Sequence, residues 1–203
     1  MIDSVNRRNY QNSFNSLDKE RYRRFFEEFA YVLDYLPHGR QSARFVTGPI
    51  VQVVGEAYFT LLEVEIKTGT TVSTNERTYI GKGKREKVNR IVGRINFEDL
   101  TESAKVELSS VLEELIANRE KVFIDFFNNA QAVTPRMHSL ELLPGVGKKL
   151  MWQILDEREK RLFDSFSDLQ ERTGLADVVK VISKRIVEEL SEESKYQLFT
   201  RIS

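Results

Sequence analysis

Two glycines followed at once by two lysines, in the stretch LLPGVGKK, are the residues whose types and spacing best suit a chemical task. Pro144 presets φ for a turn, and Gly145 can take a positive φ that other residues avoid. Gly147 stands where the next helix is expected to begin, so the amides of that first turn have no partner within the helix. They lie at the positive end of the helix dipole, which is a usual site for phosphate. We therefore expect five consecutive residues to hold a phosphate: Gly145, Val146, Gly147, Lys148 and Lys149.

A plain turn between two helices that happens to use glycine is the alternative interpretation of this stretch. A P-loop is excluded, because its pattern needs glycine at position 142 and Ser or Thr at position 149, where this chain has Leu142 and Lys149. Backbone amides contact phosphate without reading bases. The turn is therefore expected to position nucleic acid rather than to choose its sequence.

A second cluster of cations lies in the stretch GKGKREKVNRIVGR, which has one acid, Glu86. Tyr79 stands just before it, and is expected either to pack in the core or to serve as a stacking platform. A basic groove with a nearby aromatic ring is how OB-like barrels hold single strands. The alternative is a solvated edge protected by lysines. The residues expected to contact nucleic acid here are Lys82, Lys84, Arg85, Lys87 and Arg90, with Tyr79 beside them.

The rest of the chain offers little for catalysis. It has no cysteine, which excludes disulfides, thiolate zinc sites and cysteine nucleophiles. Its two histidines, His38 and His138, are far apart in the sequence. Glu63 and Glu65 share one face of an expected strand, where salt bridges to neighbouring strands are favoured over a metal site. We expect no catalytic residues, no metal, no cofactor and no small-molecule substrate.

Composition limits the class of partner. The 203 residues include 31 basic and 31 acidic ones, so the formal net charge is zero and any electrostatic attraction must come from local clusters. The N-terminus lacks the apolar region of a signal peptide, and no apolar run is long enough to span a membrane. These features favour a cytoplasmic protein with no membrane partner.

The second basic cluster lies in the N-terminal half of the chain, where the sequence pattern is typical of β-strands. Residues 1–28 are polar and basic, and read as a flexible arm or a short helix. Residues 29–98 contain about five short β-rich runs separated by glycine, among them Ile50–Val54 and Tyr58–Lys67. This count fits a small OB-like barrel. With the helical remainder, it predicts an α+β protein of two domains.

Residues 99–133 change to a helical period and are expected to connect the two domains. Thr101 is the expected N-cap of the first helix. The following stretch, EKVFIDFFNNA, either continues that helix or starts another. Residues 134–203 are expected to be all-helical, beginning with a helix from Thr134-Pro135 to Leu143 that leads into the glycine turn.

Three more helices are expected after the turn. The first should carry Leu150, Ile154 and Leu155 inward, with Trp152 also packed in the core by default. The second should be capped by a serine, Ser165 or Ser167, and end at Gly174. The third should bury one stripe of side chains, namely Val178, Val181, Ile182, Ile186 and Leu190.

The stretch LELLPGVGKKLMWQILDERE, with FDSFSDLQERTGL after it, resembles a tandem helix-hairpin-helix domain. The second hairpin position, Arg172-Thr173-Gly174-Leu175, keeps one glycine and lacks the Gly-x-Gly pair. In addition YVLDYLPHGR, GEAYFTLLEV, YIGKGKREKV, FFNNA and RMHSLELLPGVGKK, in this order, resemble the archaeal family called domain of unknown function 655, over about Phe29 to Phe199. The resemblance implies an OB-like domain, a helix-hairpin-helix domain and RNA binding.

The function expected from these features is non-catalytic binding of nucleic acid, with RNA favoured over DNA because of the family resemblance. Binding to DNA, as a repair or replication accessory protein, stays open, because helix-hairpin-helix units also grip DNA backbones. The alternative from another class is a protein-interaction adaptor within a nucleoprotein complex, which a neutral net charge allows.

Overall fold

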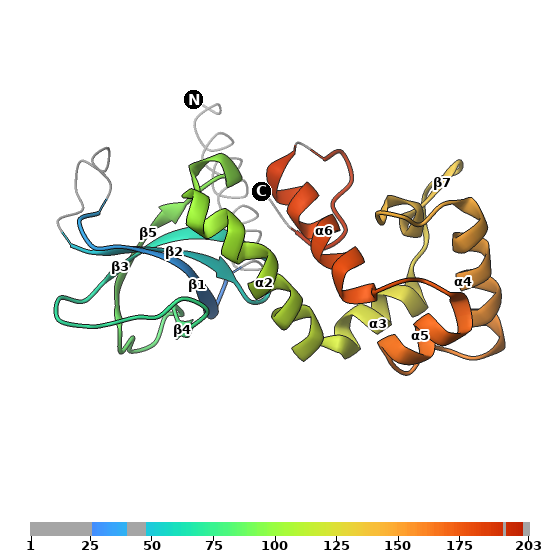
Figure 1. Cartoon of the computed structure of the whole chain (residues 1–203), viewed down its shortest axis with the longest axis horizontal. Helices are drawn as coiled ribbons and strands as arrows, with labels where there is room; N and C mark the ends of the chain where they lie inside the picture. The colour runs from blue at the N-terminus through green and yellow to red at the C-terminus, as the bar shows by residue number, and fades with distance from the viewer. Residues whose placement is uncertain (1–25, 40–47, 193, 201–203) are drawn as a thin grey trace, which may run out of the picture.

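The computed structural model describes residues 26–39, 48–192 and 194–200. The arm expected at residues 1–28 lies outside this range except for its last three residues. The described chain runs from a curled sheet at one end of the molecule to a group of helices at the other (Figure 1). It is a mixed α/β structure, as the sequence predicts.

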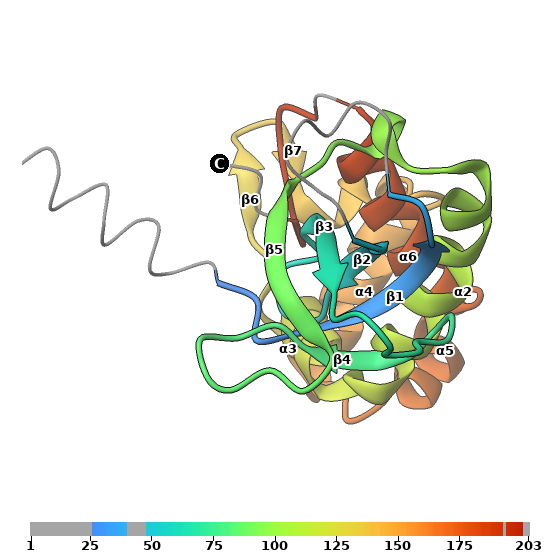
Figure 2. The ribbon, with the colours of Figure 1, turned by 90° about the vertical axis from the view of Figure 1, so that its left-hand side faces the viewer.

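A five-stranded antiparallel sheet forms the first part, in the order β4-β1-β2-β3-β5. Its strands match the β-rich runs of the sequence, although the third strand begins at Leu61, after a turn in which Phe59 has φ 58°. The sheet curls into a half-barrel (Figure 2), which is consistent with an OB-like arrangement. The strands are β1 (Phe29–Leu36), β2 (Ile50–Gly55), β3 (Leu61–Ile66), β4 (Arg77–Tyr79) and β5 (Val88–Arg94).

Both faces of this sheet bury apolar side chains, and successive residues of a strand contribute to opposite faces. One face carries a cluster that includes Ala30, Val32 and Val64. The opposite face presents Tyr31 and Leu33 to the helices. The strands β2 and β3 are buried along their whole length, although β3 alternates apolar and acidic residues, so Gln52, Glu63 and Glu65 are buried polar side chains.

Helix α2 (Glu102–Asn118) begins where the sequence predicts. The Thr101 hydroxyl accepts a hydrogen bond from the Ala104 amide at 3.0 Å and donates one to Asp34 Oδ2 at 2.6 Å. This N-cap is therefore also tied to β1. At Arg119 the helical path breaks, and a separate helix, α3 (Glu120–Asn129), follows. The open choice between one helix and two is thus resolved in favour of two.

The prediction of a helix from Thr134 to Leu143 is wrong. Residues 132–138 instead form a small hairpin of β6 (Ala132–Thr134) and β7 (Met137–His138), and a 3-10 turn, η2 (Ser139–Leu142), leads into the glycine turn. The Thr134 hydroxyl accepts a hydrogen bond from the Arg136 amide at 3.3 Å, a local contact that favours a turn over a helix.

The remaining helices are α4 (Lys148–Lys160), α5 (Phe166–Thr173) and α6 (Val178–Ser191). The Ser165 hydroxyl caps α5 by accepting from the Asp168 amide at 3.1 Å, and Gly174 ends that helix with φ 70°, both as predicted. On α4 the buried residues are Met151 and Ile154. Of the predicted stripe on α6, Val178, Ile182 and Ile186 are buried, while Val181 and Leu190 are half-buried.

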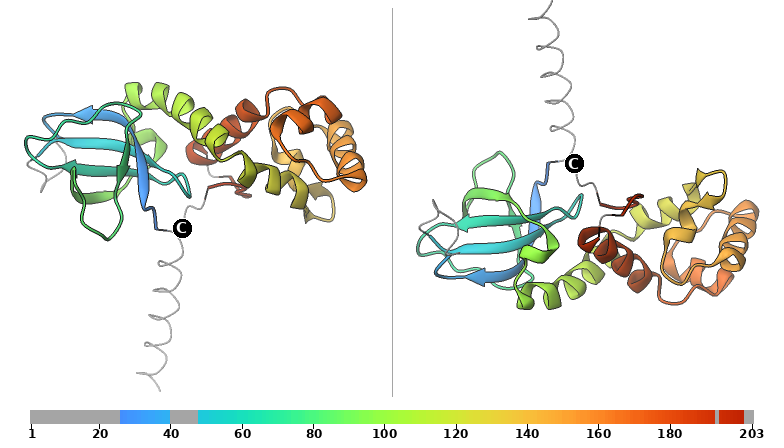
Figure 3. Two further views of the ribbon diagram at one scale, coloured as in Figure 1. Left: turned by 90° about the horizontal axis from the view of Figure 1, so that it is seen from below. Right: turned by 90° about the horizontal axis from the view of Figure 1, so that it is seen from above.

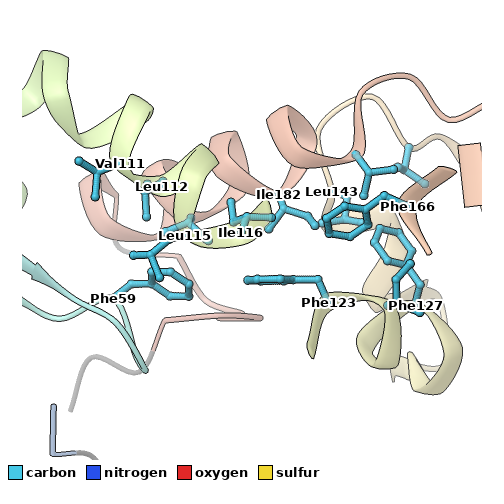
Figure 4. Packing of buried hydrophobic residues seen from close by; sticks show 14 of the residues in the cluster. Phe59, Val111, Leu112, Leu115, Ile116, Phe123, Phe127, Leu143, Phe166 and Ile182 are labelled. Atoms are coloured by element: carbon cyan, nitrogen blue, oxygen red, sulfur yellow. The ribbon is translucent and has the colours of Figure 1, made fainter. Parts of the chain in front are cut away.

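One apolar cluster joins the sheet to the helices. It runs from Phe59, beside β2 and β3, past Leu115 and Phe123 to Phe166 on α5 (Figure 4). Helix α2 packs against both β1 and α6, and lies between the two ends of the molecule (Figure 3). The core therefore passes from the β part to the helical part without a break. In the described part of the chain no helix has the length and apolar character needed to cross a membrane.

Candidate nucleic-acid interface

The glycine turn before α4 has the positive φ at Gly145 that the sequence predicts. Gly145 has φ 81° and is exposed, and an added Cβ there would meet nothing within 4 Å. The Val146 amide donates to the Leu143 carbonyl at 3.0 Å, which closes the turn. Val146 itself is only 4% exposed, so its side chain anchors the turn in the core. Its part in any phosphate site is thus to hold the turn, since its amide is already used.

Helix α4 begins without a side-chain cap. Its N-cap is Gly147, with φ −82° and ψ 174°, and its first turn contains no acidic residue. Within residues 48–192 the amides of Gly147, Lys148 and Lys149 have no backbone acceptor, as expected for the start of a helix. Both lysine side chains are exposed, and neither pairs with an acid of the described chain. The start of α4 therefore combines open amides with two unpaired cations.

The helix that follows the second expected hairpin position, residues 172–175, begins with a carboxylate cap. Asp177 caps α6: its Oδ1 accepts from the Lys180 amide at 3.2 Å, and its Oδ2 lies 3.0 Å from Lys180 Nζ. These hydrogen bonds from Lys180 lower the pKa of the Asp177 carboxyl, which keeps it charged. A carboxylate thus already occupies the place that a phosphate would take. The capped start of α6 thus differs from the uncapped start of α4.

Arg172, near the end of α5, contacts other residues of this chain through its side chain. Its Nη1 lies 3.0 Å from Asp168 Oδ2, its Nη2 donates to the Arg161 carbonyl at 2.8 Å, and its guanidinium lies 4.5 Å from the centre of the Phe163 ring. It therefore ties the end of α4 to α5 and is not offered to a ligand.

The basic cluster on the sheet divides into engaged and open cations. Lys87 pairs with Glu76 at 2.6 Å, Arg90 pairs with Glu65 at 2.6 Å, and Arg85 Nε donates to the Gly81 carbonyl at 2.7 Å. The pairing of Glu65 with β5 is the cross-strand salt bridge expected from the sequence.

Two lysines of the cluster stay available. Lys82 and Lys84 are exposed in the turn between β4 and β5, and neither forms an ion pair within the described ranges. Lys82 lies 5.6 Å from the centre of the Phe26 ring. The turn therefore offers two cations, fewer than the sequence suggests.

Tyr79 supports that turn. Its hydroxyl accepts from the Gly83 amide at 3.0 Å, and its ring meets Phe29 edge-on, with centres 5.3 Å apart. A Cβ added to Gly81 would lie 2.5 Å from the Tyr79 ring, so glycine is required at that position. Of the two roles left open for Tyr79, these contacts describe the packing one.

The structure keeps the two basic sites apart. The sheet with its β4–β5 turn occupies one end of the molecule, and α4 occupies the other (Figure 1). A single phosphate therefore cannot touch both. No group of three or more His, Asp or Glu in the described ranges is arranged to hold a metal ion.

Two residues near the turn have roles in the structure that the sequence did not predict. Trp152, expected in the core, is 59% exposed on α4. The helical period shows why: position 152 lies about 200° around the helix from Ile154, which is buried. His138 caps η2, with its Nδ1 accepting from the Leu140 amide at 3.2 Å. A lone histidine before Ser-Leu-Glu gives no clear signal of capping.

The fold and the site define a mixed α/β protein with a curled half-barrel sheet and a helical part that carries an open helix start. The chain belongs to the family described as Protein of unknown function (DUF655), whose model matches residues 26–201. An uncharacterized protein of Methanocaldococcus jannaschii is 45% identical over 178 residues, which cover 87% of this chain and 81% of that protein. The crystal structure of Af1531 from Archaeoglobus fulgidus is 48% identical, with a TM-score of 0.79, covering 86% of this chain and all of the other. The predicted family is confirmed.

Proposed function

We propose that this chain is a non-catalytic nucleic-acid-binding protein that holds a backbone phosphate at the Pro144–Gly147 turn, in the manner of a helix-hairpin-helix unit. The observation that carries the proposal is the contrast between two helix starts. Helix α6 is capped by the Asp177 carboxylate, whereas α4 starts at Gly147 with open amides and two exposed lysines. An anion that enters from solvent would satisfy the α4 amides in the way that Asp177 satisfies those of α6.

Phosphate of a nucleic-acid backbone fits this site better than a small free anion. Gly145, Gly147 and both lysines are exposed, so a polymer can approach the helix start from solvent and the lysines can reach neighbouring phosphates. A second contact at Lys82 and Lys84, on the β4–β5 turn of an OB-like half-barrel, would engage another part of the same strand. RNA is favoured over DNA on the resemblance alone, so both belong in the test.

The sharpest test changes the cap of α4. In the variant Gly147→Asp the new Cβ fits, because it would meet nothing within 4 Å and φ is negative. The carboxylate should cap α4, leaving stability unchanged or raised by up to about 1 kcal/mol. The same carboxylate should repel phosphate, so affinity for RNA measured by fluorescence anisotropy should fall about tenfold or more. Gly147→Ser, a neutral cap, is the matched control and should lose much less.

An unchanged affinity of a folded Gly147→Asp protein would contradict the phosphate site. Binding should also fall steeply with salt in wild type, since counterions are released from the backbone. Lys84→Ala should reduce the slope of log affinity against log salt concentration by about one. Lys87→Ala should change that slope little, because Glu76 already holds this lysine. An unchanged slope in Lys84→Ala would remove the β4–β5 turn from the interface.

The same titrations separate the alternatives. Duplex DNA, duplex RNA and single-stranded RNA, compared at one salt concentration, decide between the RNA and the DNA role. Absence of binding to all three at low salt favours the protein-interaction adaptor. Cleavage of any of them in the presence of Mg²⁺ or Mn²⁺ would contradict the non-catalytic role.

A further inference from the structure

Trp152 is the largest exposed apolar side chain close to the start of α4. It is the one tryptophan in the sequence, and 59% of its surface is accessible. No ring contact, cation–π contact or hydrogen bond pairs it with another residue within the described ranges. An isolated exposed apolar residue is ordinary on a protein surface. Its position on the helix is what requires explanation.

Helix geometry brings the ring toward the proposed phosphate site. Trp152 follows Lys148 by four residues and Lys149 by three, so the three side chains share one side of α4. The Cα–Cβ bond of a helical residue tilts toward the N-terminus, and a long side chain covers the turn before its own Cα. The Trp152 backbone lies about 7.5 Å along the axis from Gly147. This geometry directs the Trp152 side chain toward the first turn, on the side of the helix that carries the two lysines.

We propose that Trp152 stacks on an unpaired base of the strand whose phosphate is held at the start of α4, so that this site selects single-stranded over duplex nucleic acid. The inference rests on the proposed function, and it adds the class of substrate. An aromatic ring stacks on the face of any base, but in a duplex those faces are covered by the neighbouring base pairs and only their edges are reachable. A phosphate clamp alone would accept both forms.

Asp156 is exposed four residues after Trp152, but the charges between the ring and the helix start are basic and favour a nucleic acid over a protein as the partner of this ring. The first turn of α4 has no acid, and Lys148 and Lys149 beside the ring are unpaired within the described chain. Two adjacent cations with an aromatic ring match a phosphate followed by a base.

The test follows Trp152 itself, because it is the sole source of tryptophan fluorescence. Short single-stranded RNA should quench this fluorescence on binding. A strand of the same length without bases should bind through its phosphates, as anisotropy would show, yet leave the fluorescence unquenched. A duplex of the same sequence should behave like the strand without bases. Quenching of equal size by all three would overturn the stacking role.

Variants then separate this inference from the proposed function. Trp152→Ala should weaken binding of single-stranded RNA about tenfold or more, and leave binding of the base-free strand unchanged. Trp152→Phe should retain most of the affinity, because a ring remains. Leu162→Ala removes a side chain of similar exposure, 58%, away from the start of α4, and should have no effect.

Three outcomes are distinct. If Gly147→Asp abolishes binding while Trp152→Ala leaves it intact, the phosphate site stands and the stacking inference fails. If Trp152→Ala weakens both the normal and the base-free strand equally, stacking is again excluded. If wild type binds none of the ligands, the proposed function and the inference fail together.

Discussion

At the scale of single residues, His138 sets the entry to the glycine turn. Its Nδ1 accepts from the Leu140 amide at 3.2 Å, and its own amide donates to Glu141 Oε2 at 2.8 Å. Burial of the half-exposed ring lowers the pKa of His138, and the nearby Arg158 charge lowers that pKa further. Nδ1 can accept a hydrogen bond only while it is unprotonated. The neutral histidine is therefore the form that the fold holds.

This leads to a pH dependence of stability. Because the pKa of His138 is lower in the folded protein than its ordinary value of 6.5, the unfolded chain binds the proton first as pH falls. The contribution of His138 should thus be fully present above about pH 6.5 and be lost as pH falls from there toward the folded pKa. Urea unfolding between pH 7.5 and 5 should show it.

The control for His138 is His138→Asn, which keeps a side-chain acceptor for the Leu140 amide but cannot titrate. Carboxylates elsewhere titrate equally in both proteins, so the difference between wild type and variant isolates the histidine. The stability of wild type relative to the variant should fall on acidification. A constant difference across the range would show that His138 does not sense pH in this fold.

At the scale of elements, α6 holds the C-terminal segment through one buried carboxylate. Glu189 is 0% exposed and pairs with Arg185 Nε at 2.8 Å. It also accepts the amides of Leu198, Phe199 and Thr200, at 2.7, 3.1 and 2.9 Å. The segment after α6 has no helix or strand of its own in the described range, so these hydrogen bonds fix its path back along the helix.

Replacement of this carboxylate should therefore loosen a whole segment. Glu189→Ala leaves the Nε of the buried Arg185 without its carboxylate partner and three amides without an acceptor, and should lower the free energy of unfolding by about 3–5 kcal/mol. Hydrogen exchange of the amides at 198–200 should speed up most. Glu188→Ala, which removes a neighbouring carboxylate with 45% of its side chain exposed, should cost less than about 1 kcal/mol. Similar losses in the two variants would contradict the anchoring role.

Local signals predicted most of the elements, and the exceptions have physical causes. The strands and the caps at Thr101 and Ser165 follow from alternation and from hydroxyls that reach backbone amides close by in sequence. The helix prediction for residues 134–143 is wrong because Thr134-Pro135 suits a helix start and a turn equally well. The choice depends on the pairing of His138 with Ala132 and on the burial of Leu140.

In the candidate site, too, local sequence predicts some features, and others depend on the fold. Exposure of Lys148 and Lys149 follows from their place in the first turn of a helix, and the positive φ of Gly145 from the turn chemistry. Engagement of Lys87 by Glu76 depends on how loops far apart in sequence meet, which no local pattern records. The free cations of a basic run therefore cannot be separated from the paired ones without the fold.

At the scale of the whole molecule, the sheet and the helices share a core through α3. The Phe123 ring lies 6.4 Å from the Phe59 ring, beside the sheet, and 5.6 Å from the Phe199 ring in the C-terminal segment. Figure 4 shows Phe123 between Phe59 and the residues of α5 and α6. A contact of this kind couples the β part to the helical part, so the two basic sites should be held in a fixed relation to each other.

Truncation of this ring tests the coupling. In Phe123→Ala, whose parent side chain is 2% exposed, the free energy of unfolding should fall by about 3–5 kcal/mol, because a cavity opens in a shared core. Hydrogen exchange should speed up in β2 and β3 as well as in α5 and α6, and unfolding should stay a single transition. Val122→Ala, the adjacent residue at 52% exposure, should change stability by less than about 0.5 kcal/mol. If wild type unfolds in two steps and Phe123→Ala shifts only the helical one, the parts are independent domains, and the two basic sites need not bind the same strand at once.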